Sequence, residues 1–188
     1  AVHEFSLVDL SHCCPKLRLL DVSNNAGNVR DVDIIAVCTN CLQLTHLDVS
    51  YCSALSDHAL SALGSLTLTF LDVSFTNMDG SFLPPVLNHQ SSLITLKCAG
   101  CRFKGHFLKD IKTHCSLRHF DLQNTTFTHD DWMRLSVLFP RILSVNAVFC
   151  KHVDAQVKAA FRENTTVKDF ETVLRDEDGV EVEEEVYW

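Results

Sequence analysis

The sequence predicts one α/β domain, a solenoid in which short strands and helices alternate along a stack of similar units. A seven-residue phrase with the same apolar positions occurs six times, and its first three copies end in Leu-Asp-Val-Ser. Successive copies begin 27, 24, 25, 24 and 25 residues apart, a period typical of solenoids. The copies are residues 17–23, 44–50, 68–74, 93–99, 117–123 and 142–148.

Each copy is expected to form a strand of a parallel sheet. Its first, fourth and sixth residues are apolar, and successive side chains of a strand point to opposite faces. Positions four and six are therefore predicted to face the core, and positions three, five and seven the opposite face. One unit cannot bury its apolar face alone, so the units must stack. The fourth position holds Leu20, Leu47, Leu71, Leu96, Phe120 and Val145.

The repeat resembles that of a known family. The units fit the pattern L-x-x-L-x-L-x-x-N/C of leucine-rich repeats. The segment Cys-Leu-Gln-Leu at 41–44, and Ser56-Asp57 after Cys52, are similar to the cysteine-containing subfamily found in F-box proteins and relatives of ribonuclease inhibitor. The resemblance implies a right-handed solenoid with the parallel sheet on the concave side and the helices on the convex side. The ninth position holds Asn25, Cys52, Thr76, Cys101, Thr125 and Cys150, whose side chains can meet backbone polar groups at a turn.

Helix-start signals lie between the strands. Ser56 precedes an apolar helical pattern, and Thr128, followed by Asp131 three residues later, resembles a capping box. Pro84 and Pro85 suit the first turn of a helix, where a missing amide donor costs nothing. We therefore expect one short helix in each repeat.

The chain is expected to have three parts. Residues 1–16 are predicted to form a partial N-terminal repeat or cap helix, residues 17–166 six repeats, and residues 167–188 a degenerate C-terminal repeat or cap with an acidic tail. Asp178-Gly179 is a hairpin-turn signal within this last part. Since the chain lacks an initiating Met and opens in a helix-like segment, we expect a fragment or a processed chain.

Composition indicates the cellular compartment in which the protein is expected. The 188 residues contain no run of eighteen apolar residues and no signal-peptide pattern at the start, so we expect no membrane span. The nine cysteines are an odd number and mostly occupy repeat positions, which favours free thiols in a reducing compartment, cytoplasmic or nuclear. The triplets that begin at Asn124 and Asn164 leave the alternative of an extracellular, glycosylated protein.

The net charge of -8 is uneven. Seven acidic residues follow from Asp176 onward, so the repeat body is nearly neutral. A basic stripe is missing, which argues against nucleic acid as a partner. The last residues are expected either to cap the solenoid as a hairpin or to form an acidic tail that binds a basic surface of a partner.

Motifs for catalysis are weak. The pairs Cys38/Cys41 and Cys98/Cys101 have C-x-x-C spacing but fall on separate repeats, too far apart to share one tetrahedral ion. Phosphate-binding glycine loops and the G-x-S-x-G and H-E-x-x-H motifs are missing. We therefore expect no metal site, no cofactor and no enzymatic activity; the alternative from a different class is an enzyme that uses the thiols or histidines.

The face of the sheet opposite the core is the candidate site. Exposed aromatic side chains are typical of binding surfaces. Asp21, Asp48 and Asp72 would stand about 5 Å apart on neighbouring strands, so they would favour a basic partner, unless serines and water simply satisfy them as part of the repeat. Charge reversal of Asp48 and Asp72 is expected to abolish binding and leave the fold intact. The candidate contact residues are His46, Asp48, Tyr51, Phe70, Asp72, Phe75, Lys97, His119, Asp121 and Phe149.

The predicted function is recognition of a protein partner on the concave face without catalysis. The resemblance to F-box relatives implies a narrower alternative, the substrate-recognition part of a ubiquitin ligase, although resemblance of fold does not settle function. A further alternative is a fixed structural subunit of a large assembly.

Overall fold

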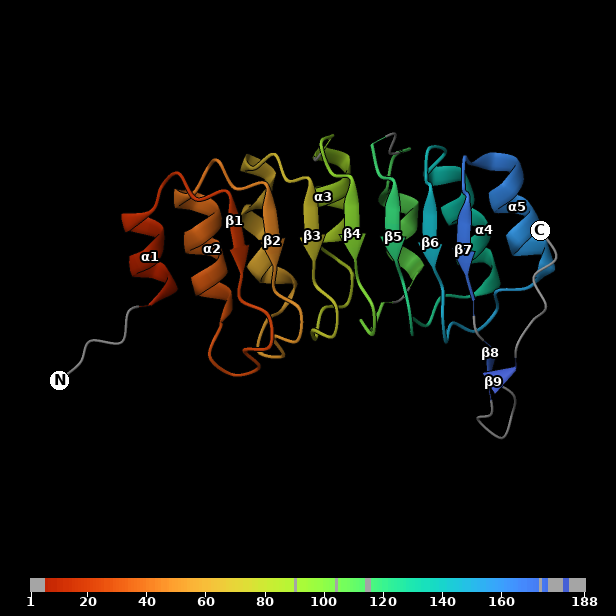
Figure 1. Cartoon of the computed structure of the whole chain (residues 1–188), viewed down its shortest axis with the longest axis horizontal. Coiled ribbons are helices and arrows are strands. Elements are labelled where there is room, and N and C mark those ends of the chain that lie inside the picture. Colours follow the sequence, from red (N-terminus) through yellow and green to blue (C-terminus); the bar gives the residue numbers. More distant parts are fainter. Residues whose placement is uncertain are drawn as a thin grey trace.

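A computed structural model describes residues 6–89, 91–103, 105–113, 116–172, 174–175 and 181–182. Strands and helices alternate along the chain, and the strands form one parallel sheet in sequence order (Figure 1). The chain is therefore an α/β protein compatible with the predicted solenoid. The strands of this sheet are β1 (Leu19–Asp21), β2 (His46–Asp48), β3 (Phe70–Asp72), β4 (Thr95–Lys97), β5 (His119–Asp121), β6 (Ser144–Asn146) and β7 (Asp169–Glu171).

The strands are stacked in register. Position four of each repeat pairs with position four of the next, as in Leu20 with Leu47 and Leu47 with Leu71. Each strand spans only positions three to five, but the hydrogen bonding continues beyond it. The amide of Val49, at position six, donates to the carbonyl of Asp72, and that of Tyr51, at position eight, donates to the carbonyl of Ser74. Neighbouring repeats are thus held together through the turn that follows each strand.

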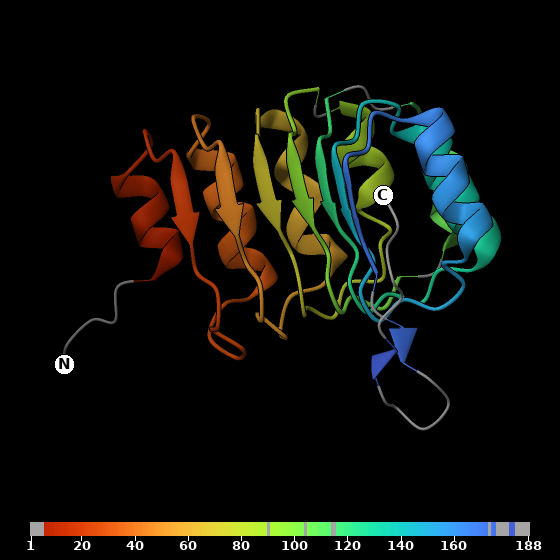
Figure 2. The ribbon, with the colours of Figure 1, turned by 45° about the vertical axis from the view of Figure 1, so that its right-hand side comes forward.

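The helices cover one side of the sheet, and its other side is left open (Figures 1 and 2). The α-helices pack against their neighbours along the stack, as α1 does against α2 and α4 against α5. The helical segments are α1 (Leu7–Cys13), α2 (Asp31–Asn40), η1 (Asp57–Ser65), α3 (Leu83–His89), η2 (Gly105–Asp110), α4 (His129–Leu138) and α5 (Ala155–Asn164).

The type of helix correlates with the length of the repeat. The segments η1 and η2 are 3₁₀ helices, and both belong to repeats whose phrases begin 24 residues apart. The repeats of 25 or 27 residues contain α-helices instead. The expectation of one helix per repeat holds, but two of the helices are of the tighter type.

The predicted inward positions are buried. All six residues at position four lie in the core, and so do those at position six from Val49 onward. Leu17 and Val22 in the first repeat are only partly buried, because no earlier strand within the described residues covers β1. The predicted phase of the strands is confirmed for positions four and six.

The predicted helix starts are also confirmed. Thr128 and Asp131 form a complete capping box, in which the Thr128 hydroxyl accepts from the amide of Asp131 and the Asp131 carboxylate accepts from that of Thr128. Ser56 caps η1 by accepting from the amide of His58. Pro84 and Pro85 lie in the first turn of α3.

The sheet ends with β7, at the place of the predicted degenerate repeat, and β7 is parallel to β6. Beyond it β8 (Leu174–Arg175) and β9 (Glu181–Val182) form an antiparallel pair. The predicted turn at Asp178-Gly179 and the final residues of the acidic tail lie outside the described residues.

None of the helices in the described part of the chain is both long and apolar enough to cross a bilayer.

The buried leucine ladder predicts the effect of truncation. Leu47→Ala should lower the free energy of unfolding by about 2 to 5 kcal/mol, because Leu47 is fully buried between Leu20 and Leu71 and leaves a cavity. Urea unfolding followed by circular dichroism measures the change. Leu42→Ala, at a side chain that is 58% exposed, is the control and should change it by less than about 0.5 kcal/mol. Equal losses in the two variants would contradict the inward assignment.

Candidate functional site

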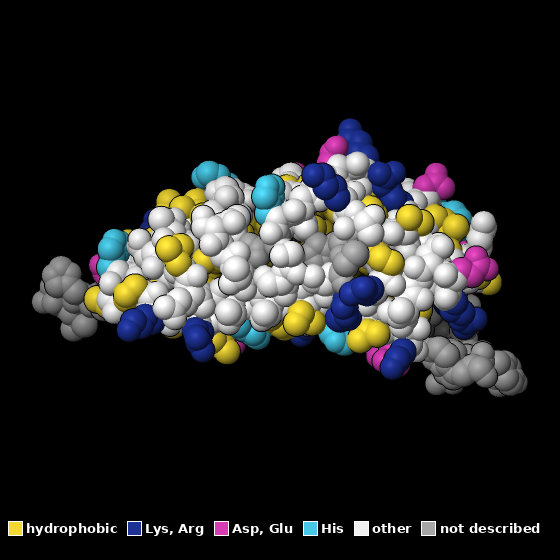
Figure 3. Space-filling model, turned by 90° about the horizontal axis from the view of Figure 1, so that it is seen from above, with side chains coloured by type: hydrophobic (Ala, Val, Ile, Leu, Met, Phe, Trp, Pro, Cys, Tyr) yellow, Lys and Arg dark blue, Asp and Glu magenta, His cyan; other side chains and the backbone are white. Residues whose placement is uncertain are grey.

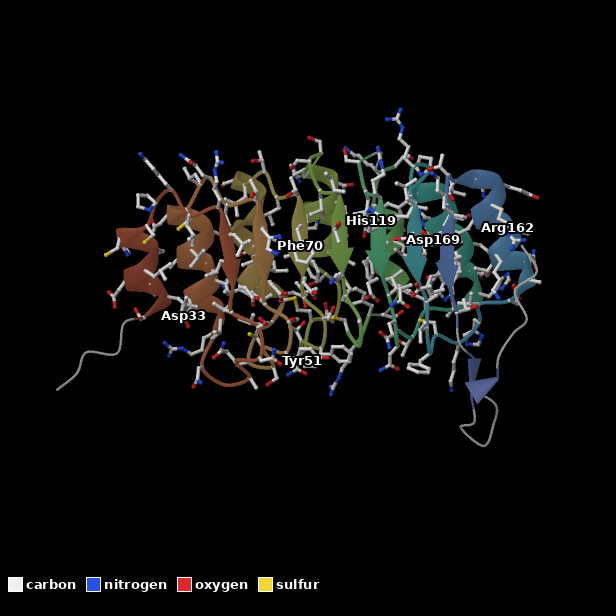
Figure 4. All side chains as sticks on the ribbon, in the orientation of Figure 1. Asp33, Tyr51, Phe70, His119, Arg162 and Asp169 are labelled. Atoms are coloured by element: carbon white, nitrogen blue, oxygen red, sulfur yellow. The ribbon has the colours of Figure 1, made fainter. Side chains whose placement is uncertain are left out.

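The candidate site is the open face, defined here as the side of β1–β7 away from the helices together with the turns that follow the strands. Phe70 and His119 lie over the strands on this face, and Tyr51 lies beyond the end of β2 (Figure 4). The structure brings most of the predicted contact residues into two aromatic pairs and one hollow. Phe149 lies half-buried in the turn after β6, four strands from the turn that carries Tyr51.

The first aromatic pair is His46 with Phe70. Their rings are stacked with centroids 3.9 Å apart and planes 4° from parallel. The ammonium group of Lys97 lies 5.4 Å from the centroid of Phe70 and 3.7 Å from Oδ2 of Asp72. A cation at this distance from an aromatic ring is attracted by its π electrons. Four predicted residues of β2, β3 and β4 therefore form one connected group with His46 at its end.

The second aromatic pair is Tyr51 with Phe75. Their rings are stacked with centroids 4.6 Å apart, and the residues are 47% and 37% exposed. Gly100, at the same position of the next repeat, makes room for this pair, because a Cβ there would lie 2.5 Å from Cδ1 of Phe75. The pair is an exposed apolar surface that the backbone of the next repeat is shaped to admit.

Position eight of each of the six predicted repeats has left-handed backbone geometry. The φ angles are 61° at Asn24, 59° at Tyr51, 55° at Phe75, 65° at Gly100 and 55° at Asn124. Phe149 continues the series in the sixth repeat with a φ of 58°. Glycine and asparagine tolerate this region, whereas a large aromatic residue is strained in it. Sequence reasoning missed this strain, although the Asn and Gly of the other repeats were the signal.

The aspartates at position five have a structural role. Each accepts a hydrogen bond from the amide two residues later, as Asp48 Oδ1 does from Ser50 at 2.9 Å, and Asn146 does the same at 3.1 Å. These Asx turns close the strand exits. In β4, where Lys97 stands instead, the amide of Ala99 donates to the hydroxyl of Ser74. The alternative in which serines satisfy the aspartates as part of the repeat is therefore supported for the row.

Two predictions about this row need correction. Asp72 is not an exposed contact residue: it is only 6% exposed, between the flanking strands and beside Lys97. Because Asp48 and Asp72 both close turns, reversing their charges would disturb the fold that was expected to stay intact.

The carboxylates of the row differ in their pKa values. Burial raises the pKa of Asp72 above its ordinary value, and the hydrogen bonds from Ser74 and the charge of Lys97 only partly oppose this. Hydrogen bonds from Ser23 lower the pKa of the exposed Asp21. On acidification Asp72 therefore takes up its proton at a higher pH than an ordinary carboxyl group does, and Asp21 at a lower pH.

The C-terminal half of the open face contains a hollow of about 170 Å³. It is lined by residues of β4 to β7, among them Lys97, His119, Asp121, Asn146 and Glu171. Nδ1 of His119 lies 2.8 Å from the hydroxyl of Ser144 on the next strand. Glu171 was missed by sequence reasoning, because the seventh phrase is degenerate and its outward positions were not assigned.

The C-x-x-C cysteines are buried thiols. Burial raises the pKa of Cys38 to about 12 and that of Cys101 to about 11. The pKa values of Cys41 and Cys98 are also raised by burial. A thiol is reactive, and binds metal, as the thiolate. Within the described part of the chain, no three His, Cys, Asp or Glu residues are grouped so that they could hold a metal ion.

The ninth-position cysteines have the backbone role that the sequence predicted for that column. Sγ of Cys52 donates to the carbonyl of Val22 at 3.2 Å, and Sγ of Cys101 donates to that of Val73 at the same distance.

Comparison of the chain with protein-family models and with curated proteins finds no match. The resemblance to leucine-rich repeats therefore depends on the repeat pattern alone.

The Asx turns generate the first prediction for this surface. Asp48→Ala should lower the free energy of unfolding by about 1.5 to 3 kcal/mol, since the amide of Ser50 loses a charged acceptor. Asp48→Asn should cost much less, because Asn146 already closes the equivalent turn of the sixth repeat. Urea unfolding of both variants tests this, and an equal loss in the two would show that the turn is not what Asp48 provides.

The opposite pKa shifts of Asp72 and Asp21 give a second prediction for this surface. Side-chain NMR titration should give a midpoint above 3.8 for Asp72 and below 3.8 for Asp21. Asp72 has the raised folded pKa, so its ionisation removes stability as pH rises from the unfolded to the folded value, and Asp72→Asn should escape that loss. Asp21 has the lowered pKa, so its contribution is present above the unfolded pKa and is lost on acidification through the folded value. Equal midpoints for the two carboxyls would contradict the burial of Asp72.

Proposed function

We propose that the chain is a non-catalytic interaction module that binds a protein partner on its open face. The observation that carries this proposal is the stacked pair of Tyr51 and Phe75. Both residues are partly exposed, at 47% and 37%, and both occupy strained left-handed positions where three other repeats use Asn or Gly and the sixth uses Phe149. Backbone strain at an exposed aromatic residue is typical of a site kept for binding.

The pair brings little to the fold itself. A non-glycine residue in left-handed geometry costs about 1 to 2 kcal/mol, and an aromatic stack returns about 0.5 to 1.5 kcal/mol. Tyr and Phe bury large areas in protein interfaces, so we expect binding of a partner to provide the stabilisation that the stack alone does not. His46 and Phe70 on the strands before these turns extend the same surface.

The thiols support a role without catalysis. Four of them form the C-x-x-C pairs, and their raised pKa values keep them protonated at neutral pH. Basic side chains are scattered on the edge of the molecule that Figure 3 shows and are interspersed with acidic and apolar ones. This distribution favours a protein over a nucleic acid as partner.

The finer assignments belong to the same proposal. We infer a right-handed leucine-rich-repeat solenoid in which the open face is concave and the helices are convex, because the repeat pattern resembles that family. A reducing compartment suits the buried cysteines, since none of the described cysteines is in a disulfide. The substrate-recognition role in an F-box-type ligase and the structural-subunit role stay predictions, as does the acidic tail's affinity for a basic surface.

Substitution by asparagine separates binding from folding. Tyr51→Asn with Phe75→Asn should abolish capture of the partner and change the free energy of unfolding by no more than about 1 kcal/mol, because relief of strain offsets loss of the stack. Affinity capture from cell extract with the whole chain as bait, followed by quantitative mass spectrometry, measures the first effect. Urea unfolding measures the second.

A matched control is Leu42→Asn with Val137→Asn, which removes two exposed apolar side chains outside the open face. Proteins bound by the wild type and by this control, but lost from the Tyr51/Phe75 variant, are the expected partners. Identical captured sets for all three baits would refute binding through the open face.

A further inference from the structure

We infer that the partner presents an arginine or lysine side chain to the hollow in the C-terminal half of the open face, four or six residues from an apolar side chain that contacts Tyr51 and Phe75. This inference rests on the proposed function and specifies the chemistry of the partner. It is carried by the shape of the hollow, by the charges that line it and by its distance from the aromatic pairs.

The hollow has the size of a single side-chain end. Its volume of about 170 Å³ compares with a cavity of about 150 Å³ that accommodates a benzene-sized group. It opens on the same side of the sheet as Phe70, and the labelled His119 and Asp169 lie over β5 and β7 beside it (Figure 4). One side chain of a bound segment can enter it from solvent.

Two carboxylates flank the hollow without a counter-ion among the described residues. Asp121 on β5 and Glu171 on β7 are in register with Asn146 between them. Asp121 uses Oδ1 for the Asx turn with Gln123, and Glu171 is exposed. Their spacing is two strand separations, about 10 Å. A guanidinium group placed over Asn146 has donors for both sides of this arrangement.

The lysine that lines the hollow does not neutralise it. Lys97 points toward β3, where its ammonium group lies near Asp72 and the ring of Phe70. Asp169 on β7 is exposed and adds a third negative charge at the rim. The carboxylates at the hollow outnumber its one lysine, and their complement is a basic side chain.

The distance between the two parts of the face sets the spacing in the partner. The centre of the hollow, at β6, is three strand separations from β3, about 14 Å across the sheet. The Tyr51/Phe75 pair lies further along the strand direction, in the turns, so the direct path is somewhat longer. Alternate side chains of an extended segment face one side and advance about 3.3 Å per residue. Positions four residues apart (about 13 Å) and six apart (about 20 Å) share one side and bracket this path.

Selection from a phage-displayed library of random twelve-residue peptides, with the whole chain as target, tests this inference. Wild-type selections should enrich Arg or Lys four or six residues from an aromatic or large apolar residue. Asp121→Asn with Glu171→Gln should lose the basic preference and keep the apolar one. The Asp121→Asn change preserves the turn, because Asn146 closes its own turn in the same way.

Fluorescence anisotropy with one enriched peptide gives the magnitude. The Asp121/Glu171 variant should bind roughly tenfold more weakly, as expected on loss of a charged hydrogen bond. The control Asp130→Asn with Glu163→Gln removes the same charge from exposed positions on α4 and α5 and should bind as the wild type does. Rising salt should weaken the wild type more than the Asp121/Glu171 variant.

The outcomes separate the inference from the function on which it rests. Apolar peptides without a basic preference, or a basic preference that survives in the Asp121/Glu171 variant, would overturn the basic partner and leave the interaction module standing. Peptides that bind the Tyr51→Asn/Phe75→Asn variant equally well, or no enrichment at all, would overturn both.

Discussion

The stacking of the strands in register is the constraint on which the rest of the structure depends. No single repeat encloses its own apolar residues. Leu47 is shielded from solvent only because Leu20 and Leu71 flank it on the neighbouring strands. The backbone ladder carries this alignment past the strands into the turns. In each of the six predicted repeats the backbone therefore takes the same conformation after the strand, whatever its side chains are.

This shared conformation divides the outward positions into two kinds. At position five the side chain stabilises the turn after the strand: Asp or Asn accepts a hydrogen bond that closes this turn in five of the six predicted repeats. At position eight the turn imposes left-handed geometry on the residue, and Tyr51 and Phe75 occupy it against their own preference. Departure from what the fold favours marks candidate functional residues here, since three repeats have the less strained Asn24, Gly100 and Asn124. Phe149 makes the same departure in the sixth repeat.

Much of the architecture could be predicted from the sequence, for reasons that particular residues make plain. The leucine columns identified the inward face because a strand has a period of two, and Thr128 with Asp131 identified a helix start because both donors must be capped. The 3₁₀ helices could not be foreseen, because the cap residues and apolar pattern mark where a helix lies and not which hydrogen-bond pattern it adopts. The same holds for the hollow, which needs Glu171 from a phrase too degenerate to align.

The candidate site was predicted as a set of residues but not as an arrangement. The aromatic residues were found because the core did not claim them, and the structure adds that they stack in pairs. The aspartates were identified by their charge, whereas the structure shows that their hydrogen bonds stabilise the turns after the strands. Burial of Asp72 depends on how β3 sits between its neighbours and on the position of Lys97, which a one-dimensional pattern does not contain.

Hydroxyl-radical footprinting of the chain, free and bound to its captured partner, tests the binding role of the open face most directly. Tyr51, Phe70 and Phe75 should become protected on binding, while Leu42 and Val137 should stay as reactive as in the free chain. Protection confined to Leu42 and Val137, with the three aromatic residues unchanged, would contradict it.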